Sequence, residues 1–295
     1  MASYLETAVE IAREAGALLT TWFERRVTVE TKGEYDLVTE ADRSSERLVV
    51  ERLRTHFPSH GIVAEEGGGH ESSSEYRWYV DPLDGTTNFA HGFPCFNVTL
   101  ALEQAGELIA GVVYDPIRQE CFTSERGAGA YLNNRRIRVS QIKRLESSLV
   151  ATGFPSRKRH LNFNIYFYHQ LAMLTHGVRR CGSAAIDLAY VACGRLDAFW
   201  EFGLNPWDMA AGKLIVLEAG GKCSDMHGKP HQLRGPDLLV DNGLIHDEIT
   251  AIAAVHFAPL AGACLSSLGA VVLRAAIRPG SVAWIDGVTY KLSER

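Results

Sequence analysis

The chain has 295 residues, of which 46% are hydrophobic and 22% charged, and its formal net charge at pH 7 is −5. This composition predicts a globular protein with one large domain or two lobes. The acidic balance lacks the basic footprint of a nucleic-acid-binding protein and favours a small ligand. The six cysteines occur singly, without zinc spacing, and the N-terminus lacks the pattern of a signal peptide. We therefore expect reduced thiols in a cytoplasmic protein.

Two helices are predicted in the first 60 residues. Apolar side chains recur at helical spacing between Tyr4 and Phe23, which indicates an amphipathic helix that packs against a core. The polar, glycine-containing stretch after it predicts a mobile loop at residues 32–36. Asp42 then begins a second helix, which should end near Phe57 because Pro58 follows. Taken alone, Asp42 is an ordinary first-turn acid that the helix dipole favours.

Two short apolar strands end in carboxylates. One covers residues 62–66, and the other covers residues 78–81, where Pro82 should stop the strand because it cannot donate to a ladder. Asp84 follows, and residues 85–88 are small, hydrogen-bonding residues that can open a helix. Carboxylates suit Mg²⁺, and backbone N–H groups at a helix start suit a phosphate. By itself this stretch fits a capped turn equally well.

A meander and then an α/β region are predicted next. Between residues 96 and 139, short β-favouring runs alternate with Gly, Pro and Asn turns, and Asn133 and Asn134 tolerate the positive φ of a two-residue hairpin turn. Strands and helices alternate afterwards, which favours an α/β lobe. The expected strands are 149–153, 178–180 and 197–200, and the expected helices are 162–176, 184–191 and 208–219.

Three stretches of this second lobe are candidates for ligand binding. Residues 181–185 form a small-residue turn that a ligand could approach closely, although tight helix packing explains it equally well. Glu201 lies between Trp200 and Phe202, where an acid needs a partner. Asp208 begins a strongly apolar helix. With the two acidic strand ends, it makes a third acid-tipped element, and such a set favours a metal cage.

The last 40 or so residues carry different signals. Residues 251–273 contain no charged residue, yet Pro259 and several glycines make them a poor membrane span. Residues 281–292 predict a hairpin with a type I′ turn at Asp286 and Gly287. We assign this tail no function, and its removal should spare catalysis.

The motifs together resemble the inositol monophosphatase family of Mg²⁺-dependent, lithium-sensitive phosphatases. The matching stretches are residues 64–66, 81–89 and 207–212, in the family's order and at about its spacing, and the likeness extends to about Ala254. The resemblance implies an α/β (α+β) fold, a layered αβαβα sandwich with its site between two lobes. We expect an N-terminal α+β lobe at residues 1–145, a C-terminal α/β lobe at 146–254 and a tail at 255–295.

The resemblance also implies a role for each site residue. The implied ligands are Glu65, Asp81 and the Leu83 carbonyl for a first Mg²⁺, and Asp81, Asp84 and Asp208 for a second. The implied substrate-binding residues are Asp84, Gly85, Thr86, Gly182, Ser183, Ala184 and Glu201. Two metal ions about 3.5–4 Å apart can stabilise both the attacking and the leaving oxygen. Thr86, paired with Asp42, and Glu65, through a weaker third ion, would orient the attacking water.

Substrate choice rests on two features. The Thr-Thr-Asn-Phe continuation at residues 86–89 resembles inositol monophosphatases. Fructose bisphosphatase relatives tend to have Ser-Ser there, and nucleotide or histidinol phosphatase relatives have a Lys or Arg after the threonine. Glu201 suits neutral hydroxyls and would repel a second phosphate. Myo-inositol monophosphate, with related polyol and sugar monophosphates, is the first expectation. Fructose 1,6-bisphosphate and adenosine 3′,5′-bisphosphate are the alternatives.

A different class of function also stays open. The resemblance implies a homodimer, and the acidic charge and the poor membrane span predict no nucleic-acid or membrane partner. Basic runs at residues 135–138 and 157–160 could nevertheless meet an acidic protein. The chain would then be mainly a regulatory or interaction protein with residual phosphatase activity. Solvated loops explain the basic runs more simply.

Overall fold

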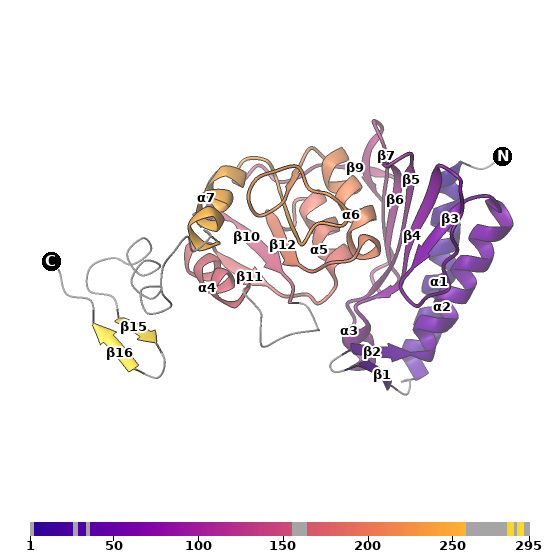
Figure 1. The fold of residues 1–295 in the computed structure, drawn as a ribbon, viewed down its shortest axis with the longest axis horizontal. Helices are drawn as coiled ribbons and strands as arrows, with labels where there is room; N and C mark the ends of the chain where they lie inside the picture. The colour runs from indigo at the N-terminus through magenta and orange to yellow at the C-terminus, as the bar shows by residue number, and fades with distance from the viewer. Residues whose placement is uncertain are drawn as a thin grey trace.

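The computed structural model describes residues 3–25, 29–33, 36–154, 164–257, 282–285 and 288–291. Two sheets alternate with three layers of helices, in the order αβαβα (Figure 1). A seven-stranded sheet and a five-stranded sheet enclose one helix pair, and each sheet carries a further pair on its outer face. The expected layered sandwich is confirmed. The division at residues 145 and 254 stays a prediction.

The first outer layer consists of helices α1 (Tyr4–Arg25) and α2 (Glu40–His56). They pack on a sheet in which only β3 and β4 run parallel and all other neighbouring strands run antiparallel. In sheet order its strands are β3 (Gly61–Ala64), β4 (Tyr76–Asp84), β5 (Asn97–Gln104), β6 (Glu107–Asp115), β7 (Glu120–Glu125), β8 (Gly129–Leu132) and β9 (Arg135–Ile137). The meander is therefore confirmed. So is the hairpin turn, where Asn133 has a φ of 48° and Asn134 one of 63°.

The second sheet is mixed. In sheet order its strands are β11 (Gly177–Arg179), β10 (Leu149–Thr152), β12 (Ala198–Phe202), β14 (Asp237–Asp241) and β13 (Lys222–Ser224). The first three run parallel, and β14 runs antiparallel to both of its neighbours. The sequence patterns predicted β10, β11 and β12 but missed β13, β14 and helix α7 (His246–His256). Helices α4 (Asn164–Leu174) and α7 pack with this sheet around Phe167, Trp200 and Ile249.

The helices between the sheets are α5 (Ala184–Ala192), which is rich in alanine, and α6 (Pro206–Glu218), which contains Ala210, Ala211 and Gly212. Small residues let the two helices approach each other and let α6 approach β6: a Cβ on Gly212 would lie 2.6 Å from the Leu188 side chain, and one on Gly111 would lie 3.1 Å from the Ala211 carbonyl oxygen. The first turns of α5 and α6 thereby come close to the end of β4. This arrangement brings two parts of the chain to one site.

Two local predictions were wrong. Strand β4 does not stop at Asp81 but continues to Asp84, because Pro82 lies in an irregular stretch where the pairing with β5 skips residues and no N–H is needed. The loop expected at residues 32–36 belongs mostly to a hairpin of β1 (Val29–Gly33) and β2 (Asp36–Thr39). Residues 34–35 lie outside the described residues.

In the tail, the predicted hairpin is present as β15 (Val282–Ile285) and β16 (Val288–Lys291), paired antiparallel. Its expected turn at residues 286–287, and residues 258–281 before it, lie outside the described part of the chain. Within the described ranges, none of the helices has the length and apolar character needed to cross a membrane.

Candidate active site

The predicted site residues converge on one pocket of about 470 Å³. It lies where β3, β4 and β12 end and where α5, α6 and the short helix α3 (Thr86–Ala90) begin. The lining includes all the predicted metal-binding and substrate-binding residues, namely Glu65, Asp81, Leu83, Asp84, Gly85, Thr86, Gly182, Ser183, Ala184, Glu201 and Asp208. Asp42 does not line the pocket and lies behind Thr86. The structure thus brings the whole set together, and the role of each residue stays a prediction.

Thr86 connects the pocket to helix α2. Its hydroxyl oxygen lies 3.1 Å from Asp42 Oδ1 and 3.1 Å from the carbonyl oxygen of Leu83, so its single proton can be donated to one of them at a time. Asp42 is buried, with 1% of its surface exposed. The preceding Gly85 has a φ of 93°, and a Cβ there would lie 2.8 Å from the Cys95 carbonyl oxygen. Only glycine fits this approach to α3.

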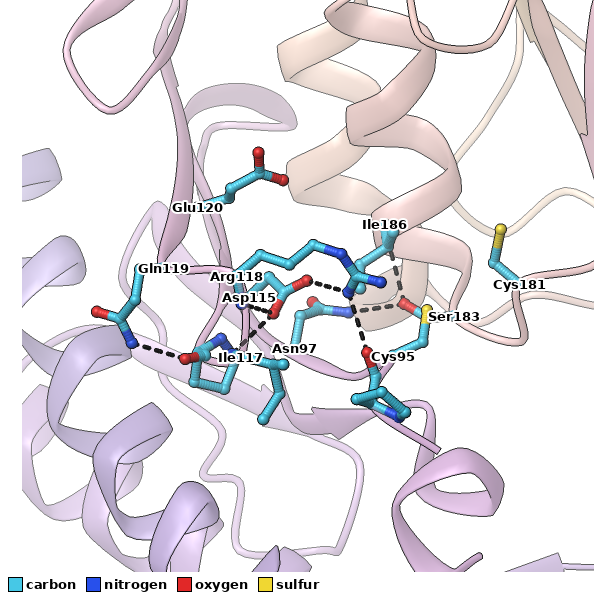
Figure 2. Close-up of polar contacts among 12 residues, drawn as sticks. Cys95, Asn97, Asp115, Ile117, Arg118, Gln119, Glu120, Cys181, Ser183 and Ile186 are labelled. Atoms are coloured by element: carbon cyan, nitrogen blue, oxygen red, sulfur yellow. Dashed lines mark hydrogen bonds and ion pairs between the residues drawn. The ribbon is translucent and has the colours of Figure 1, made fainter. Parts of the chain in front are cut away.

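Asp84 joins the two parts of the site. Its Oδ2 accepts hydrogen bonds from Asn97 Nδ2 at 3.0 Å, from Ser183 Oγ at 2.7 Å and from the Ala185 N–H at 2.9 Å. Asn97 Nδ2 also donates to Ser183 Oγ, a contact that Figure 2 shows between β5 and the start of α5. These three donors fix the orientation of the carboxylate. They all contact the same oxygen.

A second polar connection lies beside Asp84. Asn88 Nδ2 donates to the carbonyl oxygens of Cys95 and Cys181, both at 2.8 Å, and so ties α3 to the turn before α5. Arg118, in the turn between β6 and β7, supports this segment, because its Nη1 donates to Asp115 Oδ2 at 2.8 Å (Figure 2) and to the Pro94 carbonyl oxygen at 3.0 Å. The loop between α3 and β5 is held from both sides.

The other two aspartates are oriented by nearby backbone. Asp81 Oδ1 accepts a hydrogen bond from the Leu83 N–H at 3.0 Å. Asp208 Oδ2 accepts one from the Asn205 N–H at 2.7 Å, in a capping box at the start of α6. A carboxylate at this position also meets the positive end of the helix dipole. The sequence motif around Asp208 therefore serves both the helix and the pocket.

Comparison with known proteins identifies the family. The profile of the inositol monophosphatase family matches residues 1–258. The chain belongs to this family. The Nus factor SuhB of Pseudomonas aeruginosa is 46% identical over 267 residues, which cover 88% of this chain and 98% of that protein. An inositol-1-monophosphatase of Mesorhizobium japonicum is 46% identical over 246 residues, covering 82% and 90%. Family membership indicates a phosphatase that acts on phosphoric monoesters.

Solved structures of family members share the fold. The extragenic suppressor protein suhB of Bartonella henselae superposes with a TM-score of 0.81 at 41% identity, over 85% of this chain and 98% of that one. The inositol monophosphatase of Anabaena superposes with a TM-score of 0.78 at 43% identity, over 87% and 97%. Some relatives are thus named as inositol monophosphatases, whereas others are named SuhB, a name that states no enzymatic activity.

The electrostatics of the pocket fit the metal ions that this family uses. Burial raises the pKa of Asp81 well above its usual range, and the charges of Glu65, Asp84 and Asp208 raise it further. Burial also raises the pKa of Asp84, and it raises that of Asp208 to about 7. Acids so placed repel one another unless a cation lies between them. Their oxygen donors, with the Leu83 carbonyl, are the ligand type that Mg²⁺ prefers.

The ligand set is not preassembled. Among the described residues, no three Asp, Glu, His or Cys side chains already surround a common point closely enough to hold a metal ion. The backbone bonds to Asp81 and Asp208 each use a single oxygen, so the second oxygen of each carboxylate remains a possible ligand.

Sequence reasoning missed several residues that build the site. Asn97 and Asn205 orient the acids, and Arg180, Gly153 and Asp187 line the pocket. Burial raises the pKa of Asp187 to about 8, with hydrogen bonding to Cys181 acting in the opposite direction. Asn205 belongs to the local capping box with Asp208 and could have been found from that motif. Nothing in the local patterns of the other four marks them, and they come to the site only when distant elements meet.

Proposed function

We propose that the chain is a Mg²⁺-dependent phosphatase that hydrolyses myo-inositol monophosphate and related polyol and sugar monophosphates to the free alcohol and phosphate. The main support for this function is the pocket. Its lining combines buried and half-buried acids with the backbone N–H groups at the start of α3, and it includes Glu201. A phosphate ester with a hydroxylated leaving group matches these three features.

In this proposal the chain's own residues bind, orient and hold protons. Glu65, Asp81, the Leu83 carbonyl, Asp84 and Asp208 would hold two or three Mg²⁺ ions, which when bound neutralise phosphate charge and lower the pKa of water. The Gly85 and Thr86 N–H groups bind phosphate oxygens. The Thr86 hydroxyl, with Asp42 behind it, orients the water that attacks phosphorus. Asp42 fixes the direction in which this hydroxyl donates.

A covalent nucleophile is not part of this mechanism. The nearest candidate on the α3 side is Cys95, which is buried, and burial raises the pKa of its thiol to about 12. At neutral pH such a thiol is not ionised and is a poor nucleophile. Direct attack by water is consistent with this.

Glu201 would select for hydroxyl groups. It is 9% exposed and lies on the pocket wall, and burial, with the charge of Asp208, raises its pKa well above the usual range. A carboxyl group accepts a hydrogen bond from a hydroxyl in either protonation state. When ionised, it also disfavours a second phosphate at the same place.

The proposal is tested by measuring phosphate release from inositol 1-phosphate, fructose 1,6-bisphosphate and adenosine 3′,5′-bisphosphate with Mg²⁺ and again with EDTA. We expect a preference for the inositol ester that EDTA abolishes. A preference for either bisphosphate would replace the substrate assignment but keep the enzyme class. If all three esters stay intact while Mg²⁺ binds, the phosphatase proposal is wrong.

Replacing Gly153 by Ala should weaken binding of the inositol ester. A Cβ at this position would overlap the Glu201 carboxyl group, which would therefore have to leave its place. We expect the KM for inositol 1-phosphate to rise about 10-fold, the loss of roughly one hydrogen bond, while kcat changes less. Steady-state kinetics compared with Glu201→Gln provide the check. An unchanged KM in both variants would remove Glu201 from the substrate site.

A regulatory role is the second candidate, because several relatives are named Nus factor SuhB. In that case the chain would act mainly through another macromolecule and retain phosphatase activity as a by-product. The test is a pull-down from a lysate with the wild-type chain and with a catalytically inactive variant. Recovery of the chain alone in both cases would count against this role.

The proposal includes a homodimer in the cytoplasm. Helix α4 exposes Ile165, Tyr166 and Met173, with Tyr166 at 71% and Met173 at 75%, an apolar surface that a second copy could cover. The cysteines that the structure describes are free thiols, in keeping with a reducing compartment. Light scattering at several concentrations would give the mass. A monomer at all of them would contradict the dimer.

A further inference from the structure

One turn of helix α2 contacts three separate segments of the candidate site. Asp42 Oδ1 accepts from the Thr86 hydroxyl at 3.1 Å, and Ser45 Oγ donates to the Pro82 carbonyl oxygen at 2.8 Å. Glu46 accepts from the loop that follows β3. All three side chains of α2 are buried, at 1%, 0% and 4% exposure respectively. Helix α2 therefore supports the part of the pocket that is built from the N-terminal half of the chain.

The contact made by Glu46 is the most specific of the three. Its Oε2 accepts from the Glu66 N–H at 2.6 Å, and its Oε1 accepts from the Gly68 N–H at 2.7 Å. Both carboxylate oxygens are thus used on one short loop. At the start of this loop Glu65 is fixed to β4, since its N–H donates to the Val80 carbonyl oxygen at 3.3 Å. The loop is held at both ends, with Glu65 at the pocket wall.

The backbone of the loop fits tightly around this carboxylate. Gly67 has a φ of 92°, a conformation that favours glycine, and it directs the two flanking N–H groups to the same side chain. A Cβ on Gly68 would lie 2.7 Å from Glu46 Oε1. The loop backbone therefore packs closely against the Glu46 carboxylate. Glu46 serves no other described hydrogen bond.

We propose that Glu46 is a positioning residue, which holds the 65–68 loop so that Glu65 faces the pocket in the orientation needed to bind metal. This rests on the proposed function, in which Glu65 is a Mg²⁺ ligand. A carboxylate accepts two N–H bonds at once, whereas an amide offers one oxygen and turns an NH₂ group toward the second N–H. Glu46→Gln therefore leaves a partly buried N–H without an acceptor and releases that part of the loop.

The matched experiment compares Glu46→Gln with Glu51→Gln, which makes the same change of charge at an exposed position of the same helix. Amide hydrogen exchange of residues 66 and 68 is measured in the metal-free protein, and Mg²⁺ binding is measured by calorimetry. We expect faster exchange only in Glu46→Gln, together with Mg²⁺ binding weaker by about 10- to 100-fold, the usual effect of losing a residue that orients a ligand. The KM for substrate at saturating Mg²⁺ should change little.

A second variant approaches the same contact from the loop. Gly68→Ala should reproduce both effects, because its Cβ displaces the carboxylate, and the double variant should be little worse than either single one. Additive losses, or unchanged exchange and Mg²⁺ affinity in Glu46→Gln, would overturn the proposal. If the wild-type chain binds no Mg²⁺, the proposed function fails instead. The exchange measurement still reports whether Glu46 holds the loop.

Discussion

Replacing Asp84 by Asn should reduce the turnover of inositol 1-phosphate by more than about 10³-fold and leave the fold intact. Losing a single hydrogen-bond donor to a transition state typically costs 10²–10³-fold, and Asp84 is assigned here to both a metal ion and the substrate. The three donors from Asn97, Ser183 and Ala185 all contact Oδ2. An amide oxygen can take that place, which leaves a neutral NH₂ group where a negatively charged ligand oxygen is required.

The stability of this variant separates a lost ligand from a lost fold. Asp84 is one source of the charge that raises the pKa of Asp81, so removing it relieves repulsion in the metal-free protein. We expect a melting temperature without Mg²⁺ that equals or exceeds that of the wild type. Asp247→Asn is the control, because the Asp247 side chain is 98% exposed and lies on α7. Near wild-type turnover in Asp84→Asn would contradict the two-metal assignment.

Most of the fold could be predicted from the chain because its patterns are local. The periodicity of α1, the alternation of the meander and the Asn133 and Asn134 turn each depend on neighbouring residues. The exceptions are instructive. Pro82 reads as a strand stop, yet β4 continues through it because the ladder is irregular just there. Strands β13 and β14 are short and were not marked by a clear period, and the pairing of β14 with β12 on one side and with β13 on the other is a tertiary effect.

The acids of the candidate site could be predicted from the sequence, but most of the residues that orient them could not. Glu65, Asp84 and Asp208 stand at or next to the ends of elements, and Asp81 lies near the end of β4, within motifs that are visible in the sequence. By contrast, Asn97 is an ordinary strand residue until the fold brings it within 2.8 Å of Ser183, 86 positions away. Glu46 reads as one more acid of an amphipathic helix. Such residues contact partners that are distant in the sequence, and so their role depends on the folded structure.

The pH dependence of Mg²⁺ binding is expected to be steep between pH 6 and pH 8. Burial raises the pKa of Asp208 to about 7, and burial with neighbouring acids raises those of Asp81 and Asp84. A metal ligand must be deprotonated, so each proton displaced weakens binding up to about 10-fold for every pH unit below its pKa. Calorimetry should therefore show Mg²⁺ affinity on the order of 10-fold or more lower at pH 6 than at pH 8. A Mg²⁺ affinity that does not change between pH 6 and pH 8 would contradict this prediction.

The same groups set an opposite pH dependence for the metal-free fold. Because the pKa of Asp208 is raised in the folded state, its neutral form stabilises the protein fully below its unfolded pKa near 3.8, and this contribution is lost as the pH rises through about 7. Thermal melts of wild type and Asp208→Asn should diverge across that window, since Asn does not titrate. Mg²⁺ should restore more stability at pH 8 than at pH 6. The cost of burying charged carboxylates, with the repulsion among them, then explains both trends, because a bound cation offsets it.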